Sequence, residues 1–290
     1  MGRDSSDSNE KDDMGANKNW ARPAFAGADD IFETLHSGLT VKLVCTPRHE
    51  LKTCRRSDLV SEVLKANATD FDFIPVTDDF SDAPRFVGLL HAADLRENGF
   101  SDEPVSSFHL PLGEQYLIGA DASILDFVMQ ADTRPCRLVV SGAQIVGLVT
   151  LSDLQRLPVR AALFALVTGF EMTMADFIRT KLPNEAAWMA MLKPKRLDKI
   201  QNEISIAQAK DAFVDRLLFT QFTDKAEILK CLNPTGMNCS ALERQLKDFQ
   251  NLRNSLAHAN EYAASPDQAK HVCDLVRKLA SLRREICDKL

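Results

Sequence analysis

The chain has 290 residues, 45% of them hydrophobic and 26% charged, with a formal net charge of −6. This length is sufficient for two domains with separate cores, and the composition is that of an ordinary soluble protein. The polar N-terminus lacks the apolar segment of a secretory signal, and no apolar run approaches the length of a membrane span. The seven cysteines include no pair at metal-ligand spacing. The sequence therefore argues against secretion, membrane insertion and a metal site, and it favours a cytoplasmic protein.

Charge is distributed unevenly along the chain. Residues 1–159 carry 15 Lys and Arg against 25 Asp and Glu, whereas residues 160–290 carry 20 against 16. A mildly basic C-terminal half is compatible with a polyanionic ligand such as a nucleic acid. Residues 1–28 are polar and offer little apolar surface to bury, so we expect them to form a disordered tail.

Between residues 29 and 158, short strands alternate with short helices, and the order of elements repeats. The first unit has a helix and two strands, predicted over residues 57–64, 71–76 and 85–90. The second unit has the same elements, predicted over residues 122–129, 136–140 and 145–150. Both units end in the pattern Gly-apolar-apolar-x-x-x-Asp-Leu, which begins at Gly88 and again at Gly147. We therefore predict an internal repeat with units over residues 29–100 and 101–158.

The repeat resembles a tandem pair of CBS domains over about residues 39–158. The resemblance implies two βαββα-type units that bind an adenine nucleotide (AMP, ADP or ATP) or a related adenosyl ligand in a cleft between them. In this family a Gly-x-x-Thr/Ser-x-x-Asp signature holds the ribose. The second unit contains that signature as Gly147, Thr150 and Asp153.

The first unit departs from this signature. Its glycine and Asp94 are kept, but His91 stands where a hydroxyl residue is expected, so we expect the two clefts to differ. In the second unit, Arg134 is a candidate to pair with ligand phosphates, and the alternative is a solvated surface residue. Thr150 and Asp153 have a structural alternative too, because both are good helix-capping residues.

After residue 158 the strand pattern stops and apolar residues recur at helical spacing. Six helices are predicted, over residues 159–182, 184–192, 194–210, 213–232, 240–260 and 265–288. Ser240 and Glu243 form a predicted capping box at the start of the fifth. We therefore expect residues 159–290 to form an all-α bundle, and the whole chain to be an α+β protein.

Residues 253–258, of sequence RNSLAH, combine a permanent cation, an amide and an imidazole near the end of the fifth predicted helix. Arg binds phosphate in fork geometry, and His transfers protons near neutral pH. Asn254 and His258 share a helix face, whereas Arg253 and His258 diverge by about 140°. The two converge only if the Arg side chain curls round or a second copy contributes. The structural alternative is a helix end where both side chains stabilise the C-terminal dipole.

This hexapeptide resembles the R-x4-H signature of HEPN ribonucleases, and the helical half is similar to a HEPN domain over about residues 160–290. The resemblance implies metal-free RNA cleavage in a homodimer, by attack of the 2′-OH on the adjacent phosphate. His258 would act as general base or acid, Arg253 would stabilise the phosphorane, and Asn254 would orient the phosphate or the imidazole. Glu171, on the first predicted helix, corresponds to an acidic residue that some HEPN domains use to position the Arg. The alternative for Glu171 is a solvated charge.

Two functions of different classes follow from these features. The first is an adenine-nucleotide-sensing, metal-independent endoribonuclease whose paired repeats regulate a helical catalytic dimer. The second is a non-catalytic nucleotide-binding regulator whose helical domain dimerises or binds a partner or RNA. The sequence has no P-loop and no dinucleotide-binding fingerprint, which argues against metabolic catalysis.

Overall fold

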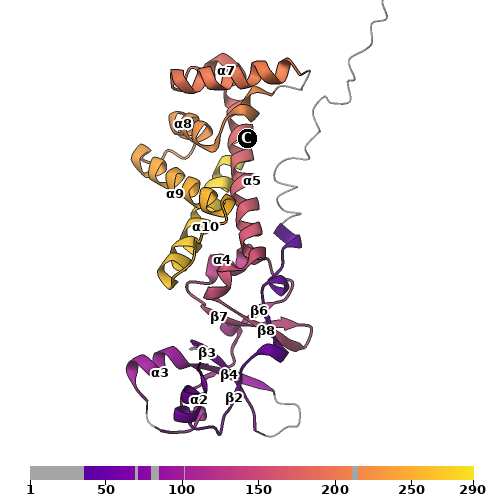
Figure 1. Cartoon of the computed structure of the whole chain (residues 1–290), viewed down its shortest axis with the longest axis vertical. Coiled ribbons are helices and arrows are strands. Elements are labelled where there is room, and N and C mark those ends of the chain that lie inside the picture. The colour runs from indigo at the N-terminus through magenta and orange to yellow at the C-terminus, as the bar shows by residue number, and fades with distance from the viewer. Residues whose placement is uncertain (1–35, 69–70, 80–84, 101, 211–214) are drawn as a thin grey trace, which may run out of the picture.

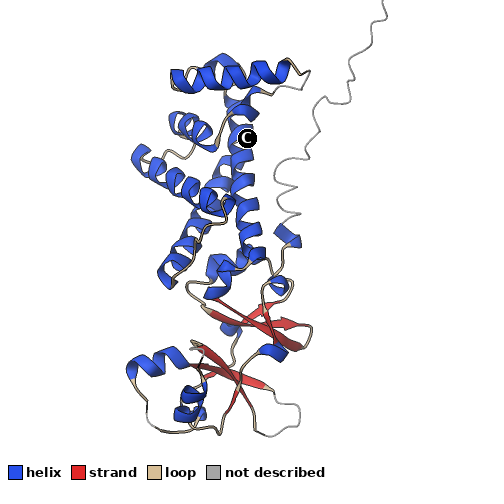
Figure 2. Ribbon diagram, in the orientation of Figure 1, coloured by secondary structure: helices blue, strands red, loops and turns tan. Residues whose placement is uncertain are grey.

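The computed structural model describes residues 36–68, 71–79, 85–100, 102–210 and 215–290. The predicted disordered tail, residues 1–28, lies outside the described residues, as does the predicted start of the fourth helix at residue 213. The described chain is elongated, with two small sheets at one end and a helical bundle at the other (Figure 1 and Figure 2). The protein is α+β, as the sequence predicts.

Two four-stranded sheets form the repeat region. The first has the strand order β2 (Cys54–Arg55), β3 (Phe73–Thr77), β4 (Phe86–His91) and β5 (Leu110–Pro111). The second has the order β1 (Thr46–Pro47), β8 (Gln144–Thr150), β7 (Cys136–Ser141) and β6 (Leu117–Gly119). The short helices of this region are α2 (Val60–Ala66), α3 (Ala92–Asn98) and α4 (Ile124–Gln130). The antiparallel pairs β3–β4 and β7–β8 are the strand pairs that the sequence predicts.

Each sheet is completed by a two-residue edge strand from the other half of the repeat region. β1 runs antiparallel to β8 with Pro47 opposite Gly147, and β5 runs antiparallel to β4 with Pro111 opposite Gly88. A Cβ atom at Gly147 would lie 2.4 Å from the carbonyl oxygen of Thr46, and Gly88 is crowded in the same way by β5. The repeated glycine therefore permits the close approach of the exchanged strand. The predicted boundary at residue 100 does not separate the two sheets.

The helical half contains α5 (Leu157–Lys181), α6 (Glu185–Met189), α7 (Pro194–Gln208), α8 (Phe222–Leu232), α9 (Cys239–Ala257) and α10 (Pro266–Cys287). The helix predicted over residues 213–232 is interrupted, because a 3-10 turn, η7 (Arg216–Phe219), precedes α8. Gln221 and Asp224 form the capping box that begins α8. The 3-10 turn η7 and the helix α8 therefore form where the sequence predicts one continuous helix.

The start of α9 also differs from the prediction. Asn238 is the N-cap residue, and its side chain accepts a hydrogen bond from the backbone N–H of Ser240 at 2.9 Å. Glu243 forms an ion pair with Lys230 of α8 at 3.0 Å. The predicted Ser240–Glu243 capping box does not form, since an asparagine two residues earlier caps the helix and a tertiary partner takes the carboxylate.

The second repeat and the helical bundle share one hydrophobic core. A single cluster of buried side chains contains Val149 and Leu154 of the second repeat, Leu163 and Phe170 of α5, and Phe249 of α9. The rings of Phe170 and Phe249 meet edge-on, with centroids 5.7 Å apart. The predicted boundary at residue 158 is consequently a change of secondary structure within one packed body.

α5 is the central helix of the bundle, and α8, α9 and α10 pack along it (Figure 1). Its mean hydropathy reaches 1.5 over an 18-residue window, so this helix is long and apolar enough to cross a membrane. This finding corrects the expectation that no apolar run approaches that length. In the structure 61% of the window is buried inside the protein. The apolar character of α5 serves largely to build the shared core.

Candidate functional site

A cavity of about 450 Å³ lies where the two repeats meet the beginning of α10. The second repeat contributes Thr150, Ser152 and Asp153 to its wall, and the first repeat contributes residues 50–52 and 71–73. Residues 263–266, at the end of the α9–α10 loop and the start of α10, close the remaining side. This volume lies within the range typical of small-molecule sites, about 300–1,000 Å³. Three parts of the chain that are distant in sequence therefore form one candidate ligand site.

Thr150 and Asp153 form a capping box at the start of the 3-10 helix η6 (Leu151–Gln155). One oxygen of Asp153, Oδ2, accepts hydrogen bonds from the Thr150 N–H at 2.6 Å and the Thr150 hydroxyl at 3.2 Å. The other, Oδ1, pairs with Nε of Arg156 at 2.6 Å. Burial raises the pKa of Asp153, and the contacts with Thr150 and Arg156 oppose that rise. The capping alternative is thus observed, at residues that also line the cavity.

Gly147 acts indirectly on this cavity. The close approach that it permits brings Thr46 of β1 to the cavity, where the Thr46 hydroxyl accepts a hydrogen bond from Nη2 of Arg156 at 2.8 Å. Arg156 is thereby held between Asp153 and β1. The signature glycine therefore shapes the wall through the backbone and places no side chain in it.

The other predicted ligand residues do not line this cavity. His91 stacks on Phe73, with ring centroids 4.3 Å apart, and Phe73 is the residue that reaches the wall. Asp94 is exposed and accepts a hydrogen bond from Asn98 at 2.7 Å. Arg134 is exposed and donates to the side chain of Gln130 at 3.3 Å. The structure therefore groups Thr150 and Asp153 together and leaves His91, Asp94 and Arg134 outside this site.

Sequence reasoning missed several residues of the wall. The Phe71 side chain is 45% exposed. The ammonium nitrogen of Lys52 lies over the Phe71 ring, 5.6 Å from the ring centroid. An aromatic face beside a cation is suited to a base and an anionic group. The sequence predicts a strand over residues 71–76, but nothing local indicates that Phe71 faces a ligand site. Residues 263–266 of the wall carry no motif at all.

The hexapeptide of residues 253–258 occupies the last turn of α9. Arg253 and Asn254 are half-buried, and His258 is the exposed C-cap residue. Among the described residues, the side chains of these three make no hydrogen bond or ion pair. The helix ends at Ala257, three residues before the predicted end, because Ala259 has the left-handed φ of 55° that terminates helices. Within one chain, therefore, the side chains of Arg253, Asn254 and His258 are not connected to one another by hydrogen bonds or ion pairs.

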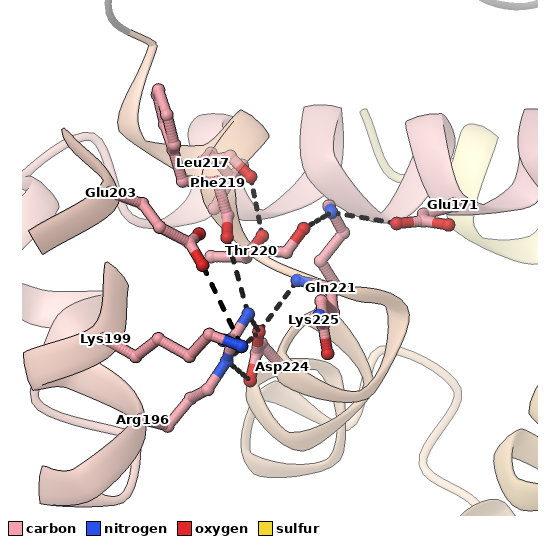
Figure 3. A network of polar contacts seen from close by, with 10 residues as sticks. All are labelled: Glu171, Arg196, Lys199, Glu203, Leu217, Phe219, Thr220, Gln221, Asp224 and Lys225. Atoms are coloured by element: carbon pink, nitrogen blue, oxygen red, sulfur yellow. Dashed lines mark hydrogen bonds and ion pairs between the residues drawn. The ribbon is translucent and has the colours of Figure 1, made fainter. Parts of the chain in front are cut away.

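Glu171 is engaged elsewhere in the bundle. Lys225 of α8 is buried, and its ammonium group donates to the Glu171 carboxylate at 3.1 Å and to the carbonyl oxygen of Thr220 at 2.8 Å (Figure 3). The adjacent Asp224 accepts two hydrogen bonds from Nε of Arg196, at 2.8 and 3.0 Å. Glu171 thus belongs to the polar network that joins α5 and α8. Within this chain, the Glu171 carboxylate is paired with Lys225 and does not position Arg253.

No family model matches this chain, and no curated protein matches it. Solved structures of CBS domains are similar to its paired-repeat part. The CBS domain of a bacterial CNNM/CorC-family Mg²⁺ transporter, in complex with ATP, is 21% identical, covering 43% of this chain and 93% of its own with a TM-score of 0.35. The CBS domains of a transcriptional regulator from Streptococcus pneumoniae are 20% identical, covering 40% and 95% with a TM-score of 0.33. CBSX2 in complex with AMP is 22% identical, covering 43% and 96% with a TM-score of 0.34.

Proposed function

We propose that this protein is a nucleotide-regulated ribonuclease, in which an adenine nucleotide occupies the cavity and residues 253–258 of two copies cleave RNA. One observation carries the proposal. The same cavity is lined by Thr150 and Asp153 and by residues 263–266, which follow His258 by only a few positions. The candidate ligand site and the candidate catalytic segment therefore lie in one packed body.

The wall suits a nucleotide in three respects. A carboxylate has about four acceptor positions, and the three contacts to Asp153 leave one for a ribose hydroxyl. The exposed ring of Phe71 offers a face on which a base stacks. Lys52 and Arg156 supply positive charge for phosphate groups. Hydroxyl, aromatic and anionic groups are the parts that an adenine nucleotide presents together.

The catalytic step follows the chemistry of the three side chains. The 2′-OH of RNA gives its proton to an imidazole of His258 as its oxygen attacks the adjacent phosphorus. The guanidinium of Arg253 stabilises the charge on the phosphorane, and the Asn254 amide orients a phosphate oxygen. The bond to the 5′ oxygen breaks, and that oxygen takes a proton from a protonated His258 imidazole as it leaves. Because Arg253 and His258 diverge by about 140° on one helix, we propose that the site is composite and the active form a homodimer.

A second candidate function is a nucleotide-binding regulator that does not cleave RNA. It is favoured by the arrangement of the helical half within one chain. Arg253 and His258 do not meet, and Glu171 is bound by Lys225 instead of approaching Arg253. In this case the helical bundle dimerises or binds a partner or RNA, and Arg253 and His258 make only structural contacts at the end of a helix.

Cleavage of labelled single-stranded RNA in EDTA separates the two functions. We expect wild type to cut, and His258→Ala to lose about 10²–10⁴-fold in rate, since general acid–base catalysis contributes that much. His271→Ala is the matched control, because His271 is another exposed histidine in the same bundle, on α10. Equal rates for His258→Ala and His271→Ala would contradict a catalytic His258. RNA that remains intact while ATP or AMP binds would favour the regulator.

Nucleotide binding is tested by calorimetry on Phe71→Ala. We expect its Kd for ATP or AMP to rise about tenfold, because stacking of one base on an aromatic ring contributes about 1–3 kcal/mol. Phe100→Ala is the control, since Phe100 is also exposed but does not line the cavity. An unchanged Kd in Phe71→Ala would place the base elsewhere, and no binding by wild type would contradict the nucleotide site.

A further inference from the structure

The loop between α9 and α10, residues 258–265, is held on its helical side by one arginine. Arg160, in the first turns of α5, donates from Nη1 to the carbonyl oxygens of Ser255 and Leu256, at 3.1 and 3.2 Å. Its Nη2 donates to the carbonyl oxygen of Asn260 at 2.7 Å. These contacts surround His258 in sequence. Arg160 therefore fixes the backbone that carries the candidate catalytic imidazole.

The same loop is held on its other side by η6. The Tyr262 hydroxyl donates a hydrogen bond to the carbonyl oxygen of Leu154, and Nε2 of Gln155 donates to the carbonyl oxygen of Ala263 at 2.6 Å. Tyr262, Ala263 and Leu154 are buried. Burial raises the pKa of Tyr262 to about 12, so its hydroxyl remains a donor at physiological pH. The Tyr262 ring also lies 4.9 Å from the guanidinium of Arg160. Tyr262 therefore connects the two attachments.

Ala259 gives this loop an unusual backbone conformation. Its φ of 55° is left-handed, a conformation that residues other than glycine adopt at a cost. Such a conformation persists where surrounding contacts impose it. Here the backbone hydrogen bond from the Asn260 N–H to the Ser255 carbonyl oxygen spans Ala259 at 3.0 Å. The contacts of Arg160, Tyr262 and Gln155 hold the backbone on either side of it. Loosening any of them allows the backbone next to His258 to relax.

The cavity is lined both by residues of η6 and by residues of the loop. η6 begins at the Thr150–Asp153 capping box and ends at the residues that hold the loop, and Ala263 and Ala264 lie in the cavity wall themselves. Four residues lie between His258 and Ala263, so the Cα atoms of these two residues are at most about 17 Å apart along the chain. A ligand in the cavity therefore contacts the loop directly and also through one turn of helix.

Building on the proposed function, we propose that loop 258–265 transmits occupancy of the nucleotide cavity to the catalytic segment. A nucleotide that contacts Asp153 and residues 263–264 holds η6 against the loop, and Tyr262 and Arg160 then set the position of His258. The signal passes within one chain, from the second repeat to the end of α9. Coupling of this kind typically changes affinity or activity by 5–150-fold.

Hydrogen exchange of wild type with and without ATP or AMP tests this inference, with nucleotide affinity measured in parallel by calorimetry. We expect bound nucleotide to slow exchange at residues 255–263 at least fivefold. Tyr262→Phe keeps the ring over Arg160 but removes the hydroxyl that binds Leu154. It is expected to bind nucleotide with an affinity within about threefold of wild type and to lose this protection. Tyr116→Phe, which changes the other tyrosine of the chain, is expected to behave as wild type.

The outcomes are distinguishable. If nucleotide binds and exchange at residues 255–263 is the same with and without it, the loop does not transmit occupancy, and the nucleotide site itself stands. If Tyr262→Phe binds nucleotide and keeps full protection, the Tyr262 contact is not the route and the inference is wrong. If calorimetry detects no binding to wild type, the proposed nucleotide function falls, and this inference falls with it. A melting temperature for each variant separates loss of coupling from loss of fold.

Discussion

Replacing Arg160 with alanine tests how strongly the end of α9 depends on a single side chain. The guanidinium makes three hydrogen bonds to backbone carbonyl oxygens and lies over the ring of Tyr262. Hydrogen bonds to a charged group contribute about 1.5–3 kcal/mol each when buried. We take about 1 kcal/mol for each here, because the residues around this turn are partly exposed. The three bonds together give at least about 3 kcal/mol for Arg160→Ala, and the ring contact with Tyr262 adds about 0.5–1 kcal/mol.

The effect is measurable both globally and locally. For a body of this size, about 3 kcal/mol lowers the melting temperature by roughly 6–12 °C. Hydrogen exchange at the amides of His258 and Asn260, which bind the carbonyl oxygens of Asn254 and Ser255, is expected to accelerate by about 100-fold. Arg244→Ala is the control, because Arg244 is exposed on α9, away from the loop, and a change there usually stays within about 0.5 kcal/mol. A melting temperature for Arg160→Ala equal to that of Arg244→Ala would refute the reasoning.

Two further predictions concern the repeat region. The Arg277 guanidinium on α10 lowers the pKa of Asp132, which lies two residues after α4, through a 2.7 Å ion pair. The unfolded chain then binds a proton that the folded chain does not, so this stabilisation is complete above about pH 4 and is lost as pH falls through the lowered pKa. Urea unfolding between pH 2 and 7 is expected to show a shallower acid loss in Asp132→Asn, and an identical profile would contradict the assignment. In Gly147→Ala, a Cβ atom 2.4 Å from a backbone oxygen is expected to cost about 1–3 kcal/mol by urea unfolding. Gly38→Ala, which meets nothing within 4 Å, is expected to be neutral, and equal midpoints would show that β1 does not pack as described.

The sequence predicted those parts of the molecule that depend on local pattern. The strand pairs β3–β4 and β7–β8 are confirmed because alternating apolar residues and polar turns are properties of neighbouring residues. The helices α5, α7, α9 and α10 are confirmed for the same reason, with ends shifted by a few residues. Those shifts occur where a capping side chain or a left-handed residue decides the end, as Asn238 and Ala259 do for α9.

The sequence failed where a residue's partner lies far along the chain. Glu171 was interpreted either as a partner of Arg253 or as a solvated charge, and nothing in the sequence indicates that Lys225, 54 residues away, binds its carboxylate. The strands β1 and β5 have two residues each, too few to show a period, and they form only because Gly147 and Gly88 let them approach. Distant contacts of this kind leave no periodic trace in the chain.

The repeat, the Thr150–Asp153 signature and the hexapeptide that ends α9 are all visible in the sequence without the structure. Only the tertiary structure decided that the second repeat and the helical bundle share one core, and that residues 263–266 form a wall of the cavity. The physical reason is that the cavity wall and its attachments join residues 108 positions apart, such as Gln155 and Ala263. Packing of buried surfaces selects such neighbours, and burial depends on the whole fold rather than on adjacent residues.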